Sequence, residues 1–111
     1  MASIANLYVD AGTTYSNIIT VAANNGFPLN LTDYTVKSQM RKSYSSSVAY
    51  DFTATILDAA TGKVRLQLTP EQSETIPPGR WLYDVEITAS DGSRTRVVEG
   101  IVTVTPQITK I

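Results

Sequence analysis

Apolar side chains recur at every second position in the last third of the chain, which reads PPGRWLYDVEITASDGSRTRVVEGIVTV from Pro77 to Val104. Successive side chains of a β-strand point to opposite faces, so this period of two predicts two strands. Asp91-Gly92 between the two runs is a strong signal for a two-residue type I′ turn. The stretch therefore predicts a β-hairpin whose register follows from counting outward from the turn.

The first face of this predicted hairpin is typical of a core. Counting from the turn gives three cross-strand pairs on it: Val85 with Val98, Tyr83 with Gly100, and Trp81 with Val102. The Tyr83 ring can cover the bare backbone of Gly100, and Ile87 and Ala89 continue the row toward the turn. We expect this face to pack against the rest of the domain.

The second face mixes apolar and acidic side chains. The same count gives the pairs Leu82 with Ile101, Asp84 with Glu99, and Glu86 with Val97. Two carboxylates directly opposite each other destabilise a strand pair unless a cation lies between them. On one interpretation this is an ordinary solvated face, and Arg65 or Lys37 of a neighbouring strand neutralises the acids.

Two other interpretations of the second face stay open. It is a contact surface if another subunit supplies the basic and apolar partners. It is a cation site if Asp84 and Glu99 share a metal ion, but two carboxylates without a clustered third ligand match calcium poorly.

The period of two extends along the rest of the chain. Five further segments between turn signals are predicted strands: Ile4 to Asp10, Tyr15 to Ala22, Thr35 to Lys42, Val48 to Ile56 and Val64 to Leu68. Thr69-Pro70-Glu71-Gln72 predicts a helix start, with Thr69 as N-cap, proline at N1 and Gln72 closing a capping box. Pro77-Pro78 keeps this helix short.

These elements predict one all-β domain. A chain of 111 residues has the length of a single domain, and no repeat or linker interrupts it. About seven short strands with regular turns and one short helical turn indicate an antiparallel β-sandwich, immunoglobulin-like in arrangement. We expect residues 1–111 to form one such sandwich with short extended segments at both ends.

Composition excludes several functional classes. The chain has no histidine and no cysteine, which removes disulfides, thiolate nucleophiles, Ser-His and Cys-His dyads, and zinc sites built from these residues. A net charge of −1, from 9 basic and 10 acidic residues spread along the chain, makes nucleic acid and anionic membranes poor partners. No apolar run is long enough to span a bilayer, and MASIANLYVDAG lacks the features of a signal peptide.

The remaining candidates for chemistry are weak. Asp84 and Glu86 are two carboxylates, the usual groups of glycoside hydrolysis, but positions i and i+2 of one strand form a common surface pattern. The glycines occur singly, so no phosphate-binding loop is present. We therefore expect no catalytic residues, no cofactor and no metal.

Four segments carry a resemblance when taken in order. They are Leu31-Thr32-Asp33-Tyr34, then GKVRLQLT from Gly62 to Thr69, PGRWLYDV from Pro78 to Val85, and EGIVTVTP from Glu99 to Pro106. Together they resemble a small module of tailed-phage virion proteins, especially those of cyanobacterial and other marine phages, over nearly the whole chain. Trp81 stands where that pattern more often has tyrosine, a change that a core position can absorb. The chain resembles less closely the immunoglobulin-like N-terminal domain of phage baseplate upper proteins.

The resemblance implies a non-enzymatic structural protein of a phage virion, assembled in the host cytoplasm. Its partners would be other phage structural proteins, and it would be a homo-oligomer or present in many copies. Capsid decoration and attachment at the tail, baseplate or neck are both open. The candidate interface residues are Leu82, Asp84, Glu86, Val97, Glu99 and Ile101 on the second face, with Ile4, Ile108 and Ile111 as anchors in the terminal segments.

Two alternatives accompany this expectation. The terminal segments either order along a neighbouring subunit or simply fray. The alternative function is that of a carbohydrate- or receptor-binding module of a fibre or baseplate. Such a module requires exposed aromatic rings. Trp81 lies on the expected core face, so the rings to examine are Tyr34, Tyr44 and Tyr50.

Overall fold

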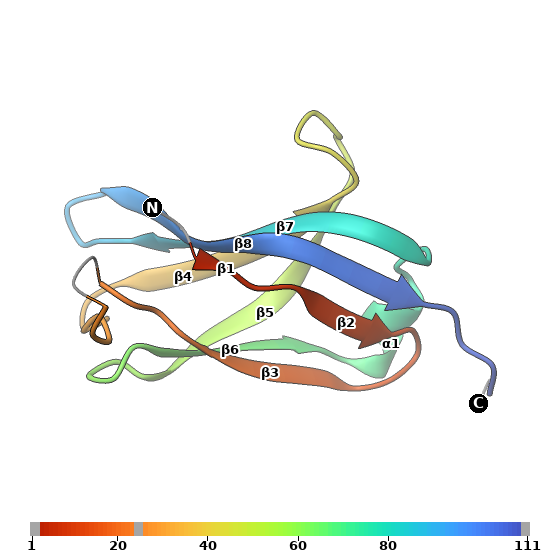
Figure 1. The fold of residues 1–111 in the computed structure, drawn as a ribbon, viewed down its shortest axis with the longest axis horizontal. Helices are drawn as coiled ribbons and strands as arrows, with labels where there is room; N and C mark the ends of the chain where they lie inside the picture. The colour runs from red at the N-terminus through yellow and green to blue at the C-terminus, as the bar shows by residue number, and fades with distance from the viewer. Residues whose placement is uncertain (1–2, 24–25, 110–111) are drawn as a thin grey trace.

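The computed structural model describes residues 3–23 and 26–109 and confirms an all-β domain (Figure 1). The strands are β1 (Ser3–Ile4), β2 (Leu7–Asp10), β3 (Tyr15–Thr20), β4 (Thr35–Arg41), β5 (Ala49–Asp58), β6 (Lys63–Leu68), β7 (Gly79–Thr88) and β8 (Arg94–Thr105), with helix α1 (Pro70–Glu74) between β6 and β7. The expected strands are present within a few residues, except that the first is broken in two.

The strands form one sheet in the order β1-β8-β7-β4-β5-β6-β3, and β2 also pairs with β8. Both β1 and β2 run parallel to β8, whereas the other pairs among the described residues are antiparallel. The expectation of a purely antiparallel arrangement is therefore wrong at the N-terminal edge. Alternation predicts which side chains face inward, but it does not set strand direction where no hairpin links the two strands.

The sheet curls because β5 belongs to both of its halves. Phe52 of β5 pairs with Ser38 of β4, whereas Ala54 pairs with Leu66 of β6. Figure 1 shows β8, β7 and β4 in one layer, β6 and β3 in the other, and β5 crossing between them. The core lies between these layers and includes the predicted inner row of the hairpin, in which Trp81 is 3% exposed.

The pairing of the N-terminal arm with β8 is interrupted between β1 and β2, at Ala5 and Asn6. The Ala5 carbonyl oxygen lies over Gly100, where any side chain would collide with it, and it accepts a hydrogen bond from the Tyr83 hydroxyl. Asn6 Oδ1 accepts a hydrogen bond of 3.1 Å from the Ile101 N–H, in place of a backbone partner. The predicted pairing of Tyr83 with Gly100 is confirmed, and the glycine is needed for the close approach of the arm.

Helix α1 begins as its capping box predicts. Thr69 Oγ1 accepts from the Gln72 N–H at 3.1 Å, and Gln72 Oε1 accepts from the Thr69 N–H at 2.8 Å. The buried Ser73 hydroxyl donates to the Thr13 carbonyl at 2.8 Å and accepts from the Gly12 N–H at 3.0 Å. The helix thereby fixes the turn between β2 and β3.

Candidate functional site

The hairpin of β7 and β8 keeps the predicted register over most of its length and departs from it near the tip. Val85 lies opposite Val98 as the count predicts, but Glu86 lies opposite Arg96 instead of Val97. The extra residue, Val97, is accommodated by a β-bulge. Val97 is partly buried and packs against the core, so it does not lie on the second face as expected.

The turn explains the bulge. The Ala89 N–H bonds to the Ser93 carbonyl at 2.8 Å and the Gly92 N–H to the Ala89 carbonyl at 3.0 Å, so the loop holds three residues, Ser90 to Gly92. Within this loop only Gly92 has a positive φ, +91°, which indicates a type I turn followed by a glycine bulge. The predicted two-residue type I′ turn is wrong. The longer loop shifts the register by one residue, and the bulge at Val97 shifts it back.

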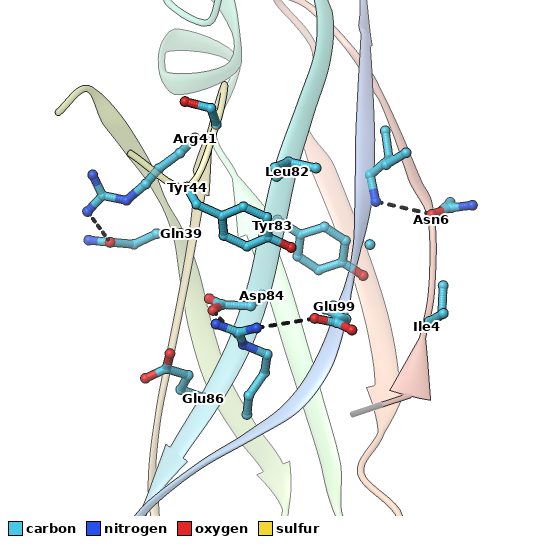
Figure 2. Close-up of a pocket in the computed structure, with 14 residues that line it drawn as sticks. Ile4, Asn6, Gln39, Arg41, Tyr44, Leu82, Tyr83, Asp84, Glu86 and Glu99 are labelled. Atoms are coloured by element: carbon cyan, nitrogen blue, oxygen red, sulfur yellow. Dashed lines mark hydrogen bonds and ion pairs between the residues drawn. The ribbon is translucent and has the colours of Figure 1, made fainter. Parts of the chain in front are cut away.

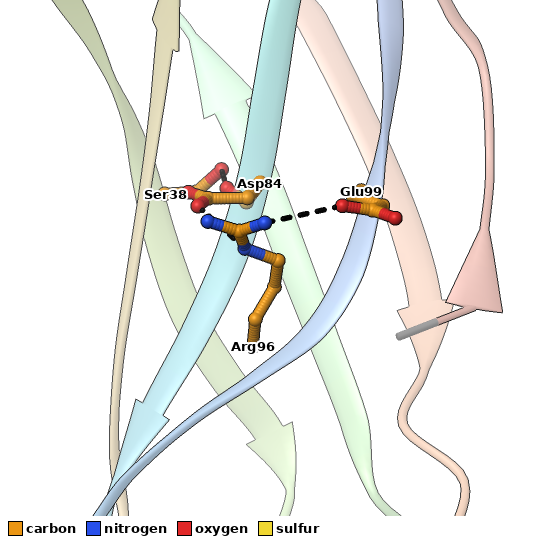
Figure 3. Close-up of polar contacts among 4 residues, drawn as sticks. All are labelled: Ser38, Asp84, Arg96 and Glu99. Carbon is orange, nitrogen blue, oxygen red and sulfur yellow. Dashed lines mark hydrogen bonds and ion pairs between the residues drawn. The ribbon is translucent and has the colours of Figure 1, made fainter. Parts of the chain in front are cut away.

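The bulge brings Arg96 onto the second face, between two acidic side chains (Figure 3). Its Nε lies 3.1 Å from Oδ2 of Asp84, and its Nη1 lies 3.3 Å from Oε2 of Glu99. The hairpin itself therefore supplies the cation, and the ion pairs of the described residues do not include one from Lys37 or Arg65, the neighbours that one interpretation of this face had offered. Residues 3–23 and 26–109 contain no group of three potential metal-ligating side chains.

Asp84 lies at the centre of this charge cluster. Burial holds the pKa of its carboxyl group above the usual value and Glu86 raises the pKa further, while Arg96 lowers it. Below it, the buried Ser38 hydroxyl donates a hydrogen bond of 2.7 Å to the Asp84 carbonyl oxygen, which fixes the backbone of β7. A carboxylate can accept about four hydrogen bonds, so Asp84 and Glu99 keep acceptor positions that Arg96 does not use.

A groove of about 590 Å³ lies over the cluster (Figure 2). Side chains of β4, β7 and β8 form its floor, and the N-terminal arm and the loop after β4 contribute at its sides. Six of the candidate interface residues line it: Ile4, Leu82, Asp84, Glu86, Glu99 and Ile101. The fold thus brings residues that are far apart in the sequence to one surface.

Of the other three candidate interface residues, two lie elsewhere. Val97 packs against the core. Ile108, beyond the end of β8, is 97% exposed and does not line the groove. Ile111 lies outside the described residues.

The sequence interpretation missed Asn6, Gln39, Arg41 and Arg96 as groove residues. Gln39 and Arg41 share the outward-facing parity of their strand, but this signal becomes useful only when β4 is known to lie beside β7. Asn6 lines the groove because the arm pairs parallel with β8. Arg96 does so because of the bulge.

Tyr44 is the exposed aromatic residue of the groove. It lies on the serine-rich loop after β4, extends over the floor near Leu82 (Figure 2), and is 79% exposed. Arg41 holds this loop, since its Nη1 donates to the Ser46 carbonyl at 2.6 Å and its Nη2 to Gln39 Oε1 at 3.3 Å. Tyr34 and Tyr50, by contrast, are partly buried and pack against the core.

The groove is close to charge balance. Three carboxylates, those of Asp84, Glu86 and Glu99, face two guanidinium groups, those of Arg41 and Arg96. Apolar side chains lie around this polar centre: Ile4, Tyr44, Leu82 and Ile101. Such a mixture of a polar centre and apolar surroundings suits binding of another molecule better than binding of a free ion.

Comparisons with known proteins do not place the chain in a family. No protein-family model and no curated protein matches it. An internalin-like protein of Listeria monocytogenes is a similar solved structure, with 14% identity, a TM-score of 0.48, and coverage of 94% of this chain and 28% of that one. A family 123 glycoside hydrolase from Clostridium perfringens is another, with 11% identity, a TM-score of 0.42, and coverage of 95% and 23%. The chain thus spans about a quarter of the length of these solved chains.

In the part of the chain that the structure describes, no helix has the length and apolar character needed to cross a bilayer.

Proposed function

We propose that the protein is a non-enzymatic structural component of a tailed-phage particle, which binds a neighbouring virion subunit through the groove. The groove itself carries this proposal, because it gathers apolar side chains from three separate segments around a fixed polar centre. The four sequence segments that resemble virion modules support the phage assignment. Capsid decoration and attachment at the tail, baseplate or neck both fit.

We also propose that the curled sheet is an immunoglobulin-like arrangement. Such domains place strands B, E and D in one layer and C, F and G in the other. The neighbours β3-β6-β5 correspond to B-E-D, and β4-β7-β8 correspond to C-F-G. The long β5 then passes from the edge of one layer to the edge of the other, as its two sets of partners require.

The groove can bind a neighbouring subunit with little loss of conformational entropy. Leu82 and Ile101 lie directly opposite each other on β7 and β8, and Ile101 is 37% exposed, so a partner that covers them buries apolar area on a rigid sheet. Arg96 is already held by Asp84 and Glu99 before binding, so less side-chain entropy is lost on contact. Acceptor positions left on these carboxylates can take hydrogen bonds from donors of the partner.

Particle incorporation tests the proposal. A phage that encodes the chain is made with Leu82→Lys plus Ile101→Lys, and purified particles are assayed for the protein by quantitative mass spectrometry. The matched control carries Val48→Lys plus Leu57→Lys, two exposed apolar residues outside the groove. We expect the control to be incorporated and the groove variant to be lost from particles while remaining folded, as judged by the near-ultraviolet circular dichroism of Trp81. Equal incorporation of both variants would refute the proposal.

A second candidate function follows from Tyr44. An exposed ring beside polar side chains of nearly balanced charge also suits a neutral, hydroxyl-rich ligand such as a glycan. A glycan array with the wild type and Tyr44→Ala tests this function. Binding that is lost in Tyr44→Ala supports glycan recognition, and an array without signal leaves the subunit contact as the function of the groove.

A further inference from the structure

The free edge of β3 has none of the features that normally protect an edge strand. β3 is the last strand of the sheet, and no strand pairs with its other edge among the described residues (Figure 1). Natural edge strands are usually short, bent, charged or interrupted by proline, because an open edge invites pairing with another chain. β3 is a continuous strand from Tyr15 to Thr20 with neither charge nor proline, and no charged residue occurs anywhere in residues 11–32.

The opposite edge of the sheet is protected by comparison. β1 and β2 are short and are separated by Ala5 and Asn6, where the strand pairing is interrupted. The inward side chains of β2 are already covered, since Leu7 is 3% and Val9 1% exposed. Asp10 at the end of β2 adds a negative charge, held by a hydrogen bond from the Thr105 hydroxyl.

The β3 edge also leaves apolar surface uncovered. Tyr15 and Ile19 face inward and pack against the core but remain only partly buried. Their partners on β6, Leu68 and Val64, are 2% and 0% exposed. Ile18 on the outer face is 54% exposed. A strand added to this edge would therefore bury side chains on both faces as well as satisfy backbone groups.

The direction of the backbone groups on β3 follows from the ladder. The Val21 N–H bonds to the Gly62 carbonyl at 2.8 Å, on the β6 side. Because hydrogen-bonded positions alternate in an antiparallel pair, the odd-numbered residues of β3 bond toward β6 and the even-numbered ones point outward. Ser16, Ile18 and Thr20 thus present their N–H and C=O groups at the free edge.

We propose that this edge pairs antiparallel with the β3 edge of a second copy of the chain, in a two-fold symmetric dimer that is independent of the groove. Centred on Ile18, this pairing places the two Ile18 side chains together and Ser16 beside the second copy's Thr20. A charged edge would repel its own copy, whereas this one carries no charge. The nearest cation opposite Ile18 is Arg65 on β6, and the two copies of it lie three strand spacings apart, about 14 Å, beyond the screening length of roughly 8 Å at physiological salt.

Sedimentation velocity over a concentration series, with amide hydrogen exchange, tests the dimer. We expect the wild type to dimerise with increasing concentration, and the amides of Ser16, Ile18 and Thr20 to become protected as it does. Ile18→Lys places a charge at the centre of the pair and is expected to weaken dimerisation at least tenfold. Thr53→Lys adds the same charge to an exposed site on β5, and this control is expected to dimerise as the wild type does.

Any other result would overturn the proposed dimer. A wild type that stays monomeric, or a dimer that Ile18→Lys leaves intact, shows that the β3 edges do not pair. Edge amides that are protected only when a different protein is added show that the edge binds another partner. Circular dichroism checks that Ile18→Lys is folded, and the exposed Ser16→Lys replaces it if it is not.

Discussion

Arg96 and Asp84 form an ion pair, Nε to Oδ2 at 3.1 Å, although they are not directly opposite in the hairpin. Arg96 lies opposite Glu86, which is two positions from Asp84 along β7 toward the tip, and its guanidinium group reaches back to the Asp84 carboxylate. The bulge at Val97 creates this arrangement, because without it Val97 would lie opposite Glu86. A single extra residue on β8 thus determines whether the centre of the groove holds a guanidinium group.

Removing this guanidinium should destabilise the protein slightly. Arg96 and Asp84 keep 43% and 28% of their side-chain surface exposed, so for Arg96→Gln we expect a loss of about 0.5–1 kcal/mol in the free energy of unfolding, in the range of partly exposed ion pairs. The loss should shrink at high salt, where the pair is screened. Urea denaturation at low and high salt measures both effects. The exposed Arg94→Gln is the control, and an equal loss in that variant would mean that the ion pair contributes nothing specific.

The pH dependence of stability should identify Asp84. Its pKa is raised in the folded state by burial, so the folded protein holds this proton more tightly than the unfolded chain does. The protonated Asp84 carboxyl group therefore contributes to stability. This contribution is fully present below the ordinary pKa of 3.8 and is lost as the pH rises through the folded-state pKa. We therefore expect the free energy of unfolding of the wild type, minus that of Asp84→Asn, to fall as the pH rises through the folded-state pKa of Asp84.

Asp91 in the hairpin loop gives a control of opposite sign. Its pKa is lowered by hydrogen bonding to Ser93, including the Ser93 N–H, which donates to Asp91 Oδ1 at 2.9 Å. Its contribution is present above the ordinary carboxyl pKa and is lost as the pH falls through the folded-state value. The free energy of unfolding of the wild type, minus that of Asp91→Asn, should therefore rise with pH. A rise for Asp84 as well would contradict the assignment of burial as the dominant cause.

Gly100→Ala should detach the N-terminal arm. The added methyl group would occupy the space of the Ala5 carbonyl, and we expect a loss of about 1–3 kcal/mol in the free energy of unfolding, as for other overpacked sites. Hydrogen exchange should show that the Ile101 amide, which bonds to Asn6 Oδ1, loses protection first. In a chain that lacks residues 1–6 the same substitution should have little effect. A full loss of stability in that shortened chain would place the strain elsewhere.

Substitutions at Gly92 in the hairpin loop should separate the effect of backbone strain from the effect of side-chain crowding. Nothing lies within 4 Å of a Cβ added to Gly92, but its φ is +91°. Gly92→Val should therefore cost about 1–3 kcal/mol through backbone strain alone, whereas Gly92→Asn should cost less, because asparagine tolerates positive φ. Thermal denaturation of the two variants measures this difference. Equal melting temperatures would show that the loop relaxes to another conformation.

The alternation of side chains was sufficient to predict the strands and the buried row of the hairpin. Trp81, Tyr83 and Val85 point inward because a strand with one covered face has only two possible settings, and burial of large apolar side chains selects one of them. The capping box of α1 was equally predictable, since Thr69 and Gln72 are only three residues apart in sequence and need no distant partner. Local chemistry and the period of two therefore determined most of the elements.

The tertiary structure alone decided the direction of the N-terminal strands, the bulge and the groove. The parallel pairing of β2 with β8 joins residues almost a whole chain apart, and no turn between them restricts the direction. The three-residue loop and the bulge at Val97 compensate each other in register, so a count from the turn cannot detect either one. Arg96, Asn6 and Tyr44 line one groove with Asp84 only because separate segments fold onto one face. The sequence by itself thus determined most of the buried residues, and long-range packing determined which of the exposed ones form a site.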